Sequence, residues 1–443
     1  MKRRPFLLFC CQERRPLRIV RFFSSSLARR AIPLLCVFLM ALPGPVLAEG
    51  FALYEFGARG IALGGAMTAR KPDPSAVAFN PALMTRLPGR HVMAGVTSIT
   101  PGGKMEWKQS DGTSGSSGLR KSTWFLPHAY YTHQINDDWF FGVGEFTRFG
   151  LGFEYPHNWP GNRNIYEVSL VTVSINPSIA WKATDSFSLA AGVEFLYGNL
   201  DLKKRSGVDG LPAQYEFDTN LRGLEATAFG FNFGGHYQLT EQWAVGLQYR
   251  TPVKAKLEGD VEFSNVNMPD AVYQRLPFRD GQASTEVTLP DSVSGGIAWT
   301  PVPEFSLEAG FVWTRWSHFD ALNIKLPWGL PEAKNPKDWK NTWRLNVGVE
   351  WDVLDWLTLR AGYVYDESPM TEQYEDYLVP TDDRHIYSGG LGFRYEAWTF
   401  DVAYAYIDPI GRRYTASNKT HTLRSKAVAS DTHIISLSLG YSF

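Results

Sequence analysis

Side chains that could catalyse a reaction are numerous in this chain, but their spacing matches no catalytic motif. The sequence contains nine histidines and many serines and aspartates. From residue 49 onward it has no Gly-x-Ser-x-Gly, no His-Glu-x-x-His, no glycine-rich phosphate loop and no metal-binding spacing of Cys or His. We therefore predict no catalytic residue, no metal ligand and no cofactor. Spacing alone leaves open a reaction centre assembled from distant segments.

The first 48 residues have the features of a secretory signal peptide. They contain nine Lys or Arg and one acid, then the apolar run Ala31–Leu42 and the small residue Ala48. The apolar run is too short to cross a bilayer as a helix. All three cysteines lie in this leader, so the mature chain, which we expect to begin at Glu49, has no disulfide. The net charge of the whole chain is −1 and that of the leader is +8, so the net charge of the mature chain is about −9. Because an acidic chain does not attract nucleic acid, we expect no nucleic-acid partner.

The rest of the chain is organised by alternation with a period of two, which indicates β-strands. The C-terminal segment shows it most clearly, because its apolar residues occupy every second position: Ile435, Leu437, Leu439, Tyr441 and Phe443. A soluble sandwich would turn such faces inward. The export signal, the aromatic ends of the apolar faces and the terminal Phe443 favour an outer-membrane barrel instead. We interpret Phe443 as the membrane-insertion signal read by the barrel-assembly machinery.

The alternation occurs in fourteen segments, so we predict an all-β membrane barrel of 14 antiparallel strands. Their approximate ranges are 90–100, 122–134, 138–152, 165–183, 186–204, 222–239, 242–264, 284–300, 304–319, 341–352, 356–368, 384–395, 397–408 and 430–443. Short and long connections alternate, as do periplasmic turns and external loops in bacterial barrels. The predicted parts are a signal peptide (1–48), an N-terminal hatch (49–88) and a barrel (89–443) in the outer membrane of a Gram-negative bacterium.

The segment 49–88 differs from the barrel because it is rich in Gly and Ala and shows no strand alternation. A compact segment on the N-terminal side of a closed barrel can fill the lumen, so we predict that it is a plug. Its polar side chains Glu55 and Asn80 then need hydrogen-bond partners from the lumen. Among the loops, Asp111–Gly118 is predicted to be a flexible tip, and residues 268–276 a short amphipathic helix.

Several motifs, in order along the chain, resemble the FadL family, the outer-membrane transporters of long-chain fatty acids and other hydrophobic compounds. Two lie in the N-terminal segment: Gly50-Phe51-x-Leu53-x-Glu55-Phe56 and Phe79-Asn80-Pro81-Ala82. The others are Phe149-Gly-Leu-Gly-Phe153, Val287-Thr-Leu-Pro-Asp291, Trp313-Thr-Arg-Trp-Ser317, Tyr363-Val-Tyr-Asp-Glu-Ser-Pro369 and Val379-Pro-x-Asp382-Asp-Arg384. The resemblance covers nearly the whole mature chain and implies a fourteen-stranded barrel with an N-terminal hatch.

The resemblance also implies passive uptake, with capture at the external loops and lateral release through a kinked third strand. It places hatch residues at Glu55, Asn80, Pro81 and Ala82, substrate contacts at Phe51, Leu53, Phe149, Phe153 and Lys325, and the lateral opening at Gly150 and Gly152. The sequence supports this opening, because alternation slips after Val143 and glycines weaken a strand. The expected partners are hydrophobic small molecules, outer-membrane lipid and lipopolysaccharide, and we expect a monomer.

Two classes of substrate stay open at this point. Fatty-acid members of the family meet the carboxylate with basic residues, and here that match is incomplete: Asn199 stands at one such position, Lys203, Lys204 and Arg205 follow it, and Lys325 falls near another. Fatty acids are the first prediction, and neutral or aromatic hydrocarbons are the second. The alternative from another functional class is a barrel enzyme or a structural or adhesive barrel. Loss of uptake without loss of barrel assembly would indicate a transporter, whereas uptake that is unchanged when the protein is deleted would favour this alternative.

Overall fold

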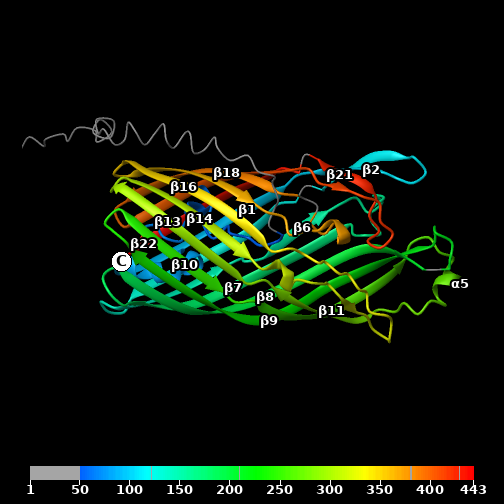
Figure 1. Ribbon diagram of the computed structural model, residues 1–443. Coiled ribbons are helices and arrows are strands. Elements are labelled where there is room, and N and C mark those ends of the chain that lie inside the picture. Colours follow the sequence, from blue (N-terminus) through cyan, green and yellow to red (C-terminus); the bar gives the residue numbers. More distant parts are fainter. Residues whose placement is uncertain (1–49, 121, 209, 380–381, 429) are drawn as a thin grey trace, which may run out of the picture.

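One antiparallel sheet closes on itself to form the body of the molecule (Figure 1). The computed structural model describes residues 50–443 except 121, 209, 380–381 and 429. The first strand, β1 (Arg90–Pro101), pairs with the last, β22 (Thr432–Ser442), on one edge and with β4 (Trp124–Gln134) on the other. Because the first and last strands are neighbours, the sheet is a closed barrel. The predicted signal peptide lies outside the described residues.

The wall contains the predicted 14 strands, of which three are interrupted. The continuous strands are β1, β4, β7 (Glu167–Lys182), β8 (Phe187–Gly207), β9 (Glu216–Gln238), β14 (Phe305–Thr314), β16 (Thr342–Leu354), β17 (Leu357–Asp366), β18 (Arg384–Tyr395), β19 (Trp398–Pro409) and β22. The interrupted strands are β5 (Trp139–Phe146) with β6 (Gly150–Glu154), β10 (Trp243–Arg250) with β11 (Val253–Asn265), and β12 (Gly281–Leu289) with β13 (Ser292–Val302). A short piece, β15 (Ile324–Lys325), pairs with β12.

Two of these interruptions are absent from the predicted ranges, which ran continuously through 242–264 and 284–300. They fall at Pro252 and Pro290, between the paired segments. Proline has no backbone N–H to donate to a ladder, and at these two positions the strand is interrupted. The apolar alternation continues on both sides of each proline, so the sequence pattern predicted one unbroken strand.

Alternation separates an apolar outer face from a small, polar inner face. In β22, Ile435, Leu437 and Leu439 are 51%, 41% and 50% exposed, whereas Ser436 and Ser438 are buried. A soluble sandwich would bury the apolar residues, so their outward position is typical of a wall that faces lipid. Within the described ranges, no helix has the length and apolar character needed to span a bilayer.

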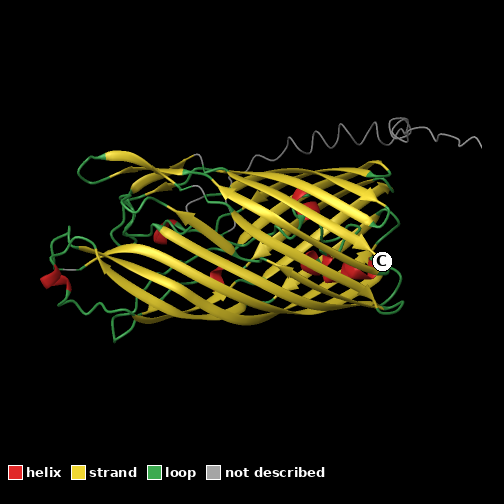
Figure 2. Cartoon of the chain, turned by 180° about the vertical axis from the view of Figure 1, so that it is seen from behind, coloured by secondary structure: helices red, strands yellow, loops and turns green. Residues whose placement is uncertain are grey.

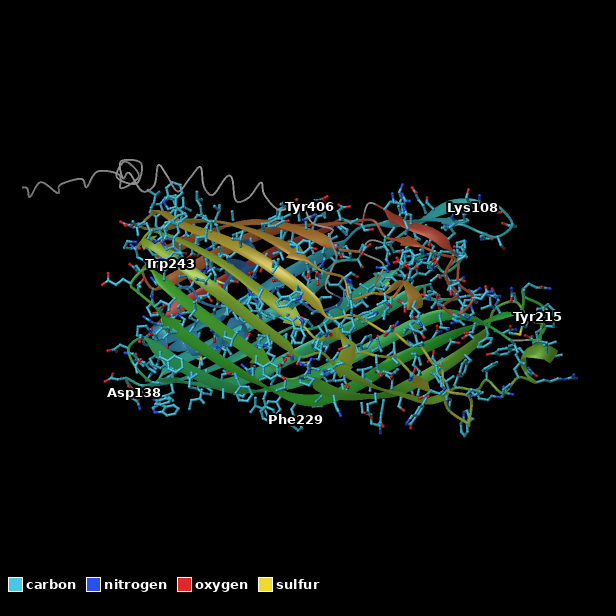
Figure 3. The ribbon with its side chains drawn as sticks, in the orientation of Figure 1. Lys108, Asp138, Tyr215, Phe229, Trp243 and Tyr406 are labelled. Carbon is cyan, nitrogen blue, oxygen red and sulfur yellow. The ribbon has the colours of Figure 1, made fainter. Side chains whose placement is uncertain are left out.

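The two ends of the barrel differ in the length of their connections (Figures 1 and 2). Short turns and the C-terminus lie at one end, where Trp243 stacks on Trp299 with ring centroids 5.8 Å apart (Figure 3). At the other end β8, β9 and β11 extend beyond the rest of the wall and carry long loops. We identify the long-loop end as external, because bacterial barrels have short periplasmic turns.

The external end carries a second sheet that was not predicted. It consists of β2 (Lys104–Lys108), β3 (Ser114–Gly118), β20 (Arg413–Tyr414) and β21 (Arg424–Val428), in the order β20-β21-β2-β3. The prediction of a flexible tip at 111–118 is therefore wrong for Ser114–Gly118, whose backbone pairs with β2. The predicted loop helix is present but short, as α5 (Asp270–Tyr273). The remaining external turns include η2 (Trp316–His318) and η3 (Glu372–Tyr374).

Residues 50–88, called the hatch below, lie inside the ring of strands (Figure 2). They form α3 (Ala58–Ala62), α4 (Ala76–Phe79) and η1 (Pro81–Arg86). α3 contacts β17, β18, β19 and β22, while η1 contacts β5, β7, β8 and β9, so the hatch reaches different sides of the wall. This position agrees with the predicted plug, although the domain boundaries themselves stay predictions.

Replacement of the C-terminal Phe443 tests whether this residue is recognised during barrel assembly, without weakening the finished barrel. Its side chain is 74% exposed, so its removal takes away little packing. We expect Phe443→Ala to lower the amount of heat-modifiable, membrane-inserted protein while export continues. The matched control is Tyr395→Ala, an aromatic residue with 73% exposure at a periplasmic turn. Wild-type assembly of Phe443→Ala would count against an insertion signal.

Candidate functional site

The hatch is fixed to the wall through buried polar contacts. The carboxylate of Glu308 in β14 accepts hydrogen bonds from the backbone N–H groups of Thr68 (2.7 Å), Ala69 (3.2 Å) and Arg70 (2.8 Å). Arg59 donates two hydrogen bonds to Glu350 of β16, at 2.7 and 2.8 Å. Removing one partner from a buried ion pair costs about 3–5 kcal/mol. Expulsion of the whole hatch would break several such contacts, so a route that leaves it in place is favoured.

The predicted hatch residues Asn80, Pro81 and Ala82 lie together at the start of η1. The Asn80 side-chain amide donates to the carbonyl oxygens of Thr68 (2.8 Å) and Gly235 in β9 (3.0 Å). Its side-chain oxygen accepts from the Ala82 N–H at 3.2 Å, which caps the helix, and Pro81 occupies the first helical position. Asn80 thus has the lumen partner that its burial requires.

The third wall strand is broken where the sequence predicted a kink. β5 ends at Phe146 and β6 begins at Gly150. β4 pairs with β5 only from Ala129 onward, and among the described residues β6 pairs with β7 alone. The wall therefore has an opening, called the window below, between residues 124–128 of β4 and residues 147–152. Its external edge is closed by Arg120, whose backbone N–H donates to the Glu154 carbonyl at 2.8 Å and whose side chain pairs with the Glu154 carboxylate.

The start of the hatch replaces the missing wall contacts from inside. Leu53 N–H donates to the Arg148 carbonyl at 2.9 Å, and Gly150 N–H donates to the Phe51 carbonyl at 3.0 Å. Ala52 and Phe149 form an isolated antiparallel bridge. These bonds satisfy backbone groups that would otherwise be unpaired at membrane depth. The sequence Gly50–Leu53 thus holds the broken strand in position.

A cavity of about 230 Å³ runs from the hatch to the window. On the inside it is lined by Phe51, Leu53 and Phe153. Its lining also includes Phe125 and Val171, whose side chains are 70% and 41% exposed on the outer face of the barrel. The cavity is therefore lined both by hatch residues and by wall residues that are exposed on the outer face.

Two glycines keep the window open, because each lies directly beside a larger side chain. A Cβ atom added to Gly152 would lie 2.2 Å from the ring of Trp124, and one added to Gly150 would lie 2.7 Å from Leu53 Cδ1. Both glycines line the cavity, as does Trp124. The window is thus apolar and narrow.

Aromatic rings surround Phe51 at the inner end of the cavity. Its ring centroid lies 4.8 Å from Trp316, 5.3 Å from Phe319 and 5.8 Å from Trp339, and all four side chains are buried. Phe149 is 6.0 Å from Phe51 and lines a neighbouring cavity of about 30 Å³. Such a cluster offers apolar contact to alkyl and aromatic molecules alike.

One guanidinium at this end has unused donor capacity. Arg344 of β16 lines both cavities, and its side chain is nearly buried. Its Nη1 pairs with Asp366 at 3.3 Å, but Asp366 also pairs with Arg384 at 2.7 Å. Arg344 Nε has no hydrogen-bond partner among the described residues. The predicted hatch residue Glu55 also lines the cavity, where its carboxylate accepts a hydrogen bond from Tyr54 N–H at 2.9 Å.

The structure does not bring Lys325 to this cavity. Lys325 is exposed in β15, where it is the partner of Ser284 in β12. Of the other basic positions, Arg205 pairs with Asp218 at 2.8 Å and Lys203 with Glu167 at 2.9 Å. Sequence reasoning missed Trp124, Trp316 and Arg344. Arg344 could have been found, because it stands on the inward face of an otherwise regular strand.

The fold and the cavity together define a class of protein. A closed barrel with an apolar outer face, a lumen occupied by its own N-terminal segment and an apolar cavity between that segment and the wall is a plugged outer-membrane transport barrel. Residues 40–443 match the family described as "Outer membrane protein transport protein (OMPP1/FadL/TodX)", and the chain belongs to this family. It is a transport barrel of the Gram-negative outer membrane and not an enzyme.

Individual relatives are distant but match over most of their length. The long-chain fatty acid transport protein of Escherichia coli is 26% identical over 81% of this chain and 86% of its own. Outer membrane protein P1 of Haemophilus influenzae is 24% identical over 93% and 98%. Among solved structures, a Pseudomonas aeruginosa FadL homologue has a TM-score of 0.79 at 22% identity, covering 90% of this chain and 100% of that one. The P. putida toluene transporter TodX has a TM-score of 0.70 at 19% identity, covering 88% and 99%.

Proposed function

We propose that this barrel takes up long-chain fatty acids by passive diffusion and releases them sideways through the window beside β6. The observation that carries this proposal is the cavity that begins at Phe51 and Leu53 and is also lined by Phe125 on the outer face. A hydrophobic molecule crosses the lipopolysaccharide layer poorly, so an apolar path past that layer and an exit into lipid would suffice for uptake. The buried anchors of the hatch support an exit that does not require its removal.

Capture would take place at the external loops. Phe217 stacks on Phe278 with centroids 4.4 Å apart, and Phe263 lies 5.4 Å from Phe278. Tyr273 and Leu276, in and just after α5, pack against the same cluster. An apolar cluster of this kind at the cell surface can hold an alkyl chain before it enters the lumen.

The head group would be read by Arg344. A fatty-acid carboxylate in the cavity could accept a hydrogen bond from the Arg344 guanidinium that lines it, and a charge-assisted bond is stronger than one between neutral groups. A neutral or aromatic hydrocarbon is the second candidate substrate. It is favoured by the rings around Phe51 and by Glu55, whose carboxylate would repel an anion in the same cavity.

Measuring oleate and toluene uptake by cells that depend on this barrel distinguishes the two candidate substrates. We expect Arg344→Gln to lower the rate of labelled oleate uptake about tenfold, because about 1.4 kcal/mol of a charge-assisted bond is lost, and to leave toluene uptake unchanged. The matched control is Arg394→Gln, which removes an arginine that pairs with Asp352 near a periplasmic turn. Oleate uptake unaffected by Arg344→Gln would contradict the head-group site. Toluene uptake without any oleate uptake by the wild type would select the second candidate.

A further inference from the structure

A basic surface lies outside the transport route, on the external sheet of β2, β3, β20 and β21, of which Lys108 is labelled in Figure 3. Alternation gives this sheet two faces. One face packs against the external loops, where the ring centroid of Tyr414 lies 4.9 Å from that of Tyr377, and its residues Met105, Tyr414 and Ala427 are buried. The opposite face, called the basic face below, exposes Lys104, Lys108, Arg413, Arg424 and Lys426, with Glu106 as the single acid of these four strands.

The charges of the basic face are neighbours and are poorly compensated. The strand register places Lys108 opposite Arg424, and Lys426 opposite both Glu106 and Arg413. Lys104 pairs with Glu106 at 4.0 Å, and among the described residues the other four cations have no ion pair. Like charges held opposite one another in a sheet repel. The mature chain as a whole is acidic, so this concentration of positive charge does not follow from its composition.

The position of the basic face relates it to the membrane. β2 continues β1 after Gly102-Gly103, and β21 leads into β22 after residues 429–431. Directly below, the same part of the wall presents Val96, Ile435 and Leu437 to lipid. A strand rises about 3.3 Å per residue, so these five-residue strands extend roughly 17 Å from the end of the wall. The basic face thus stands on the external side of the lipid-facing band, where the head groups of the outer leaflet lie.

We propose that the basic face binds the phosphate groups of lipopolysaccharide. In the outer leaflet this lipid carries phosphates on the sugars just above its acyl chains, and phosphate is the anion that clustered Lys and Arg side chains bind best at a membrane surface. Such binding would fix the orientation of the external sheet beside the loops. It does not depend on which cargo the barrel carries.

The test uses the full barrel purified in detergent, with bisphosphorylated lipid A as the probe and native mass spectrometry as the readout. In the test variant Lys104, Lys108, Arg424 and Lys426 are replaced by Gln. We expect it to retain at least about tenfold less lipid A than the wild type, since each cation near an anionic surface contributes separately. The matched control replaces Lys254, Lys256, Arg275 and Lys334, which are four exposed cations elsewhere on the chain, by Gln.

The wild type should bind monophosphorylated lipid A and phosphatidylglycerol more weakly than the bisphosphorylated probe. Equal retention by the test variant and the wild type, an equal loss in the control variant, or equally strong binding of phosphatidylglycerol would each overturn the proposal. If the fourfold variant does not insert, Lys108→Gln with Arg424→Gln gives the same test with about threefold loss expected. Oleate uptake by the test variant should stay at the wild-type rate, so this result is distinguishable from failure of the transport proposal.

Discussion

Replacement of Gly150 and Gly152 together by valine is expected to reduce uptake of labelled oleate to background while the barrel remains inserted. The new side chains would occupy the window, because even a Cβ atom at Gly152 would lie 2.2 Å from the Trp124 ring and one at Gly150 would lie 2.7 Å from Leu53. The ladders of β6 with β7 and of β5 with β4 use backbone groups, which valine retains. Heat-modifiability would show that the barrel is assembled.

The matched control for this variant is Gly198→Val with Gly235→Val. These glycines also lie in wall strands, but added Cβ atoms would meet their nearest neighbours, Thr172 and Leu189, at 3.8 Å, an ordinary contact distance. Surface binding of oleate should persist in both double variants. Uptake at the wild-type rate by the Gly150 and Gly152 variant would mean that cargo leaves by another route, straight down through the hatch.

Deletion of residues 50–87 is expected to turn a tight barrel into an open pore. The wall strands pair with one another around the full circle, because β5 pairs with both β4 and β7, so insertion should not require the hatch. The backbone groups of Arg148 and Gly150 that the hatch pairs would meet water in the open lumen. The carboxylates of Glu308 and Glu350 would lose their hatch partners, but in an open lumen water would solvate them. Flux of a small sugar into proteoliposomes should rise from background to the level of a general porin.

The control for the hatch deletion removes residues 110–113, which lie in the turn of the external hairpin between β2 and β3. That deletion lies outside the lumen and should leave the sugar flux at background. A hatch-deleted barrel as tight as the wild type would show that loops or inward side chains close the lumen, and the plug would then have another role.

Regular alternation made the barrel predictable from sequence. The C-terminal segment Ile435 to Leu439 indicated its strand and the face that meets lipid, because every second residue there points to the same side. The same signal was present but overlooked in Lys104–Lys108 and Arg424–Val428, two short alternating runs that form the external sheet. Short runs are easily assigned to loops when no partner strand is visible in the sequence.

The site was predictable only in part, because its contacts join residues far apart in the chain. Gly150, Gly152 and Phe51 could be selected from local glycine content and from the family resemblance. The pairs Arg59 with Glu350 and Arg70 with Glu308 come together only when the barrel closes around the hatch. Lys325 was selected by proximity to a family position, and the register of β15 with β12 places it on the surface instead.

The most direct test of lateral release is reversible closure of the window by a thiol reagent. All three cysteines lie in residues 1–48, the predicted signal peptide, so Gly150→Cys would introduce the only thiol from residue 49 onward, at a position whose nearest neighbour is the flexible end of Leu53. Gly235→Cys, beside Leu189, is the control. Benzyl methanethiosulfonate should stop oleate uptake through Gly150→Cys, reduction should restore it, and the control should transport throughout. Unchanged uptake through a fully labelled Gly150→Cys barrel would contradict release through the window.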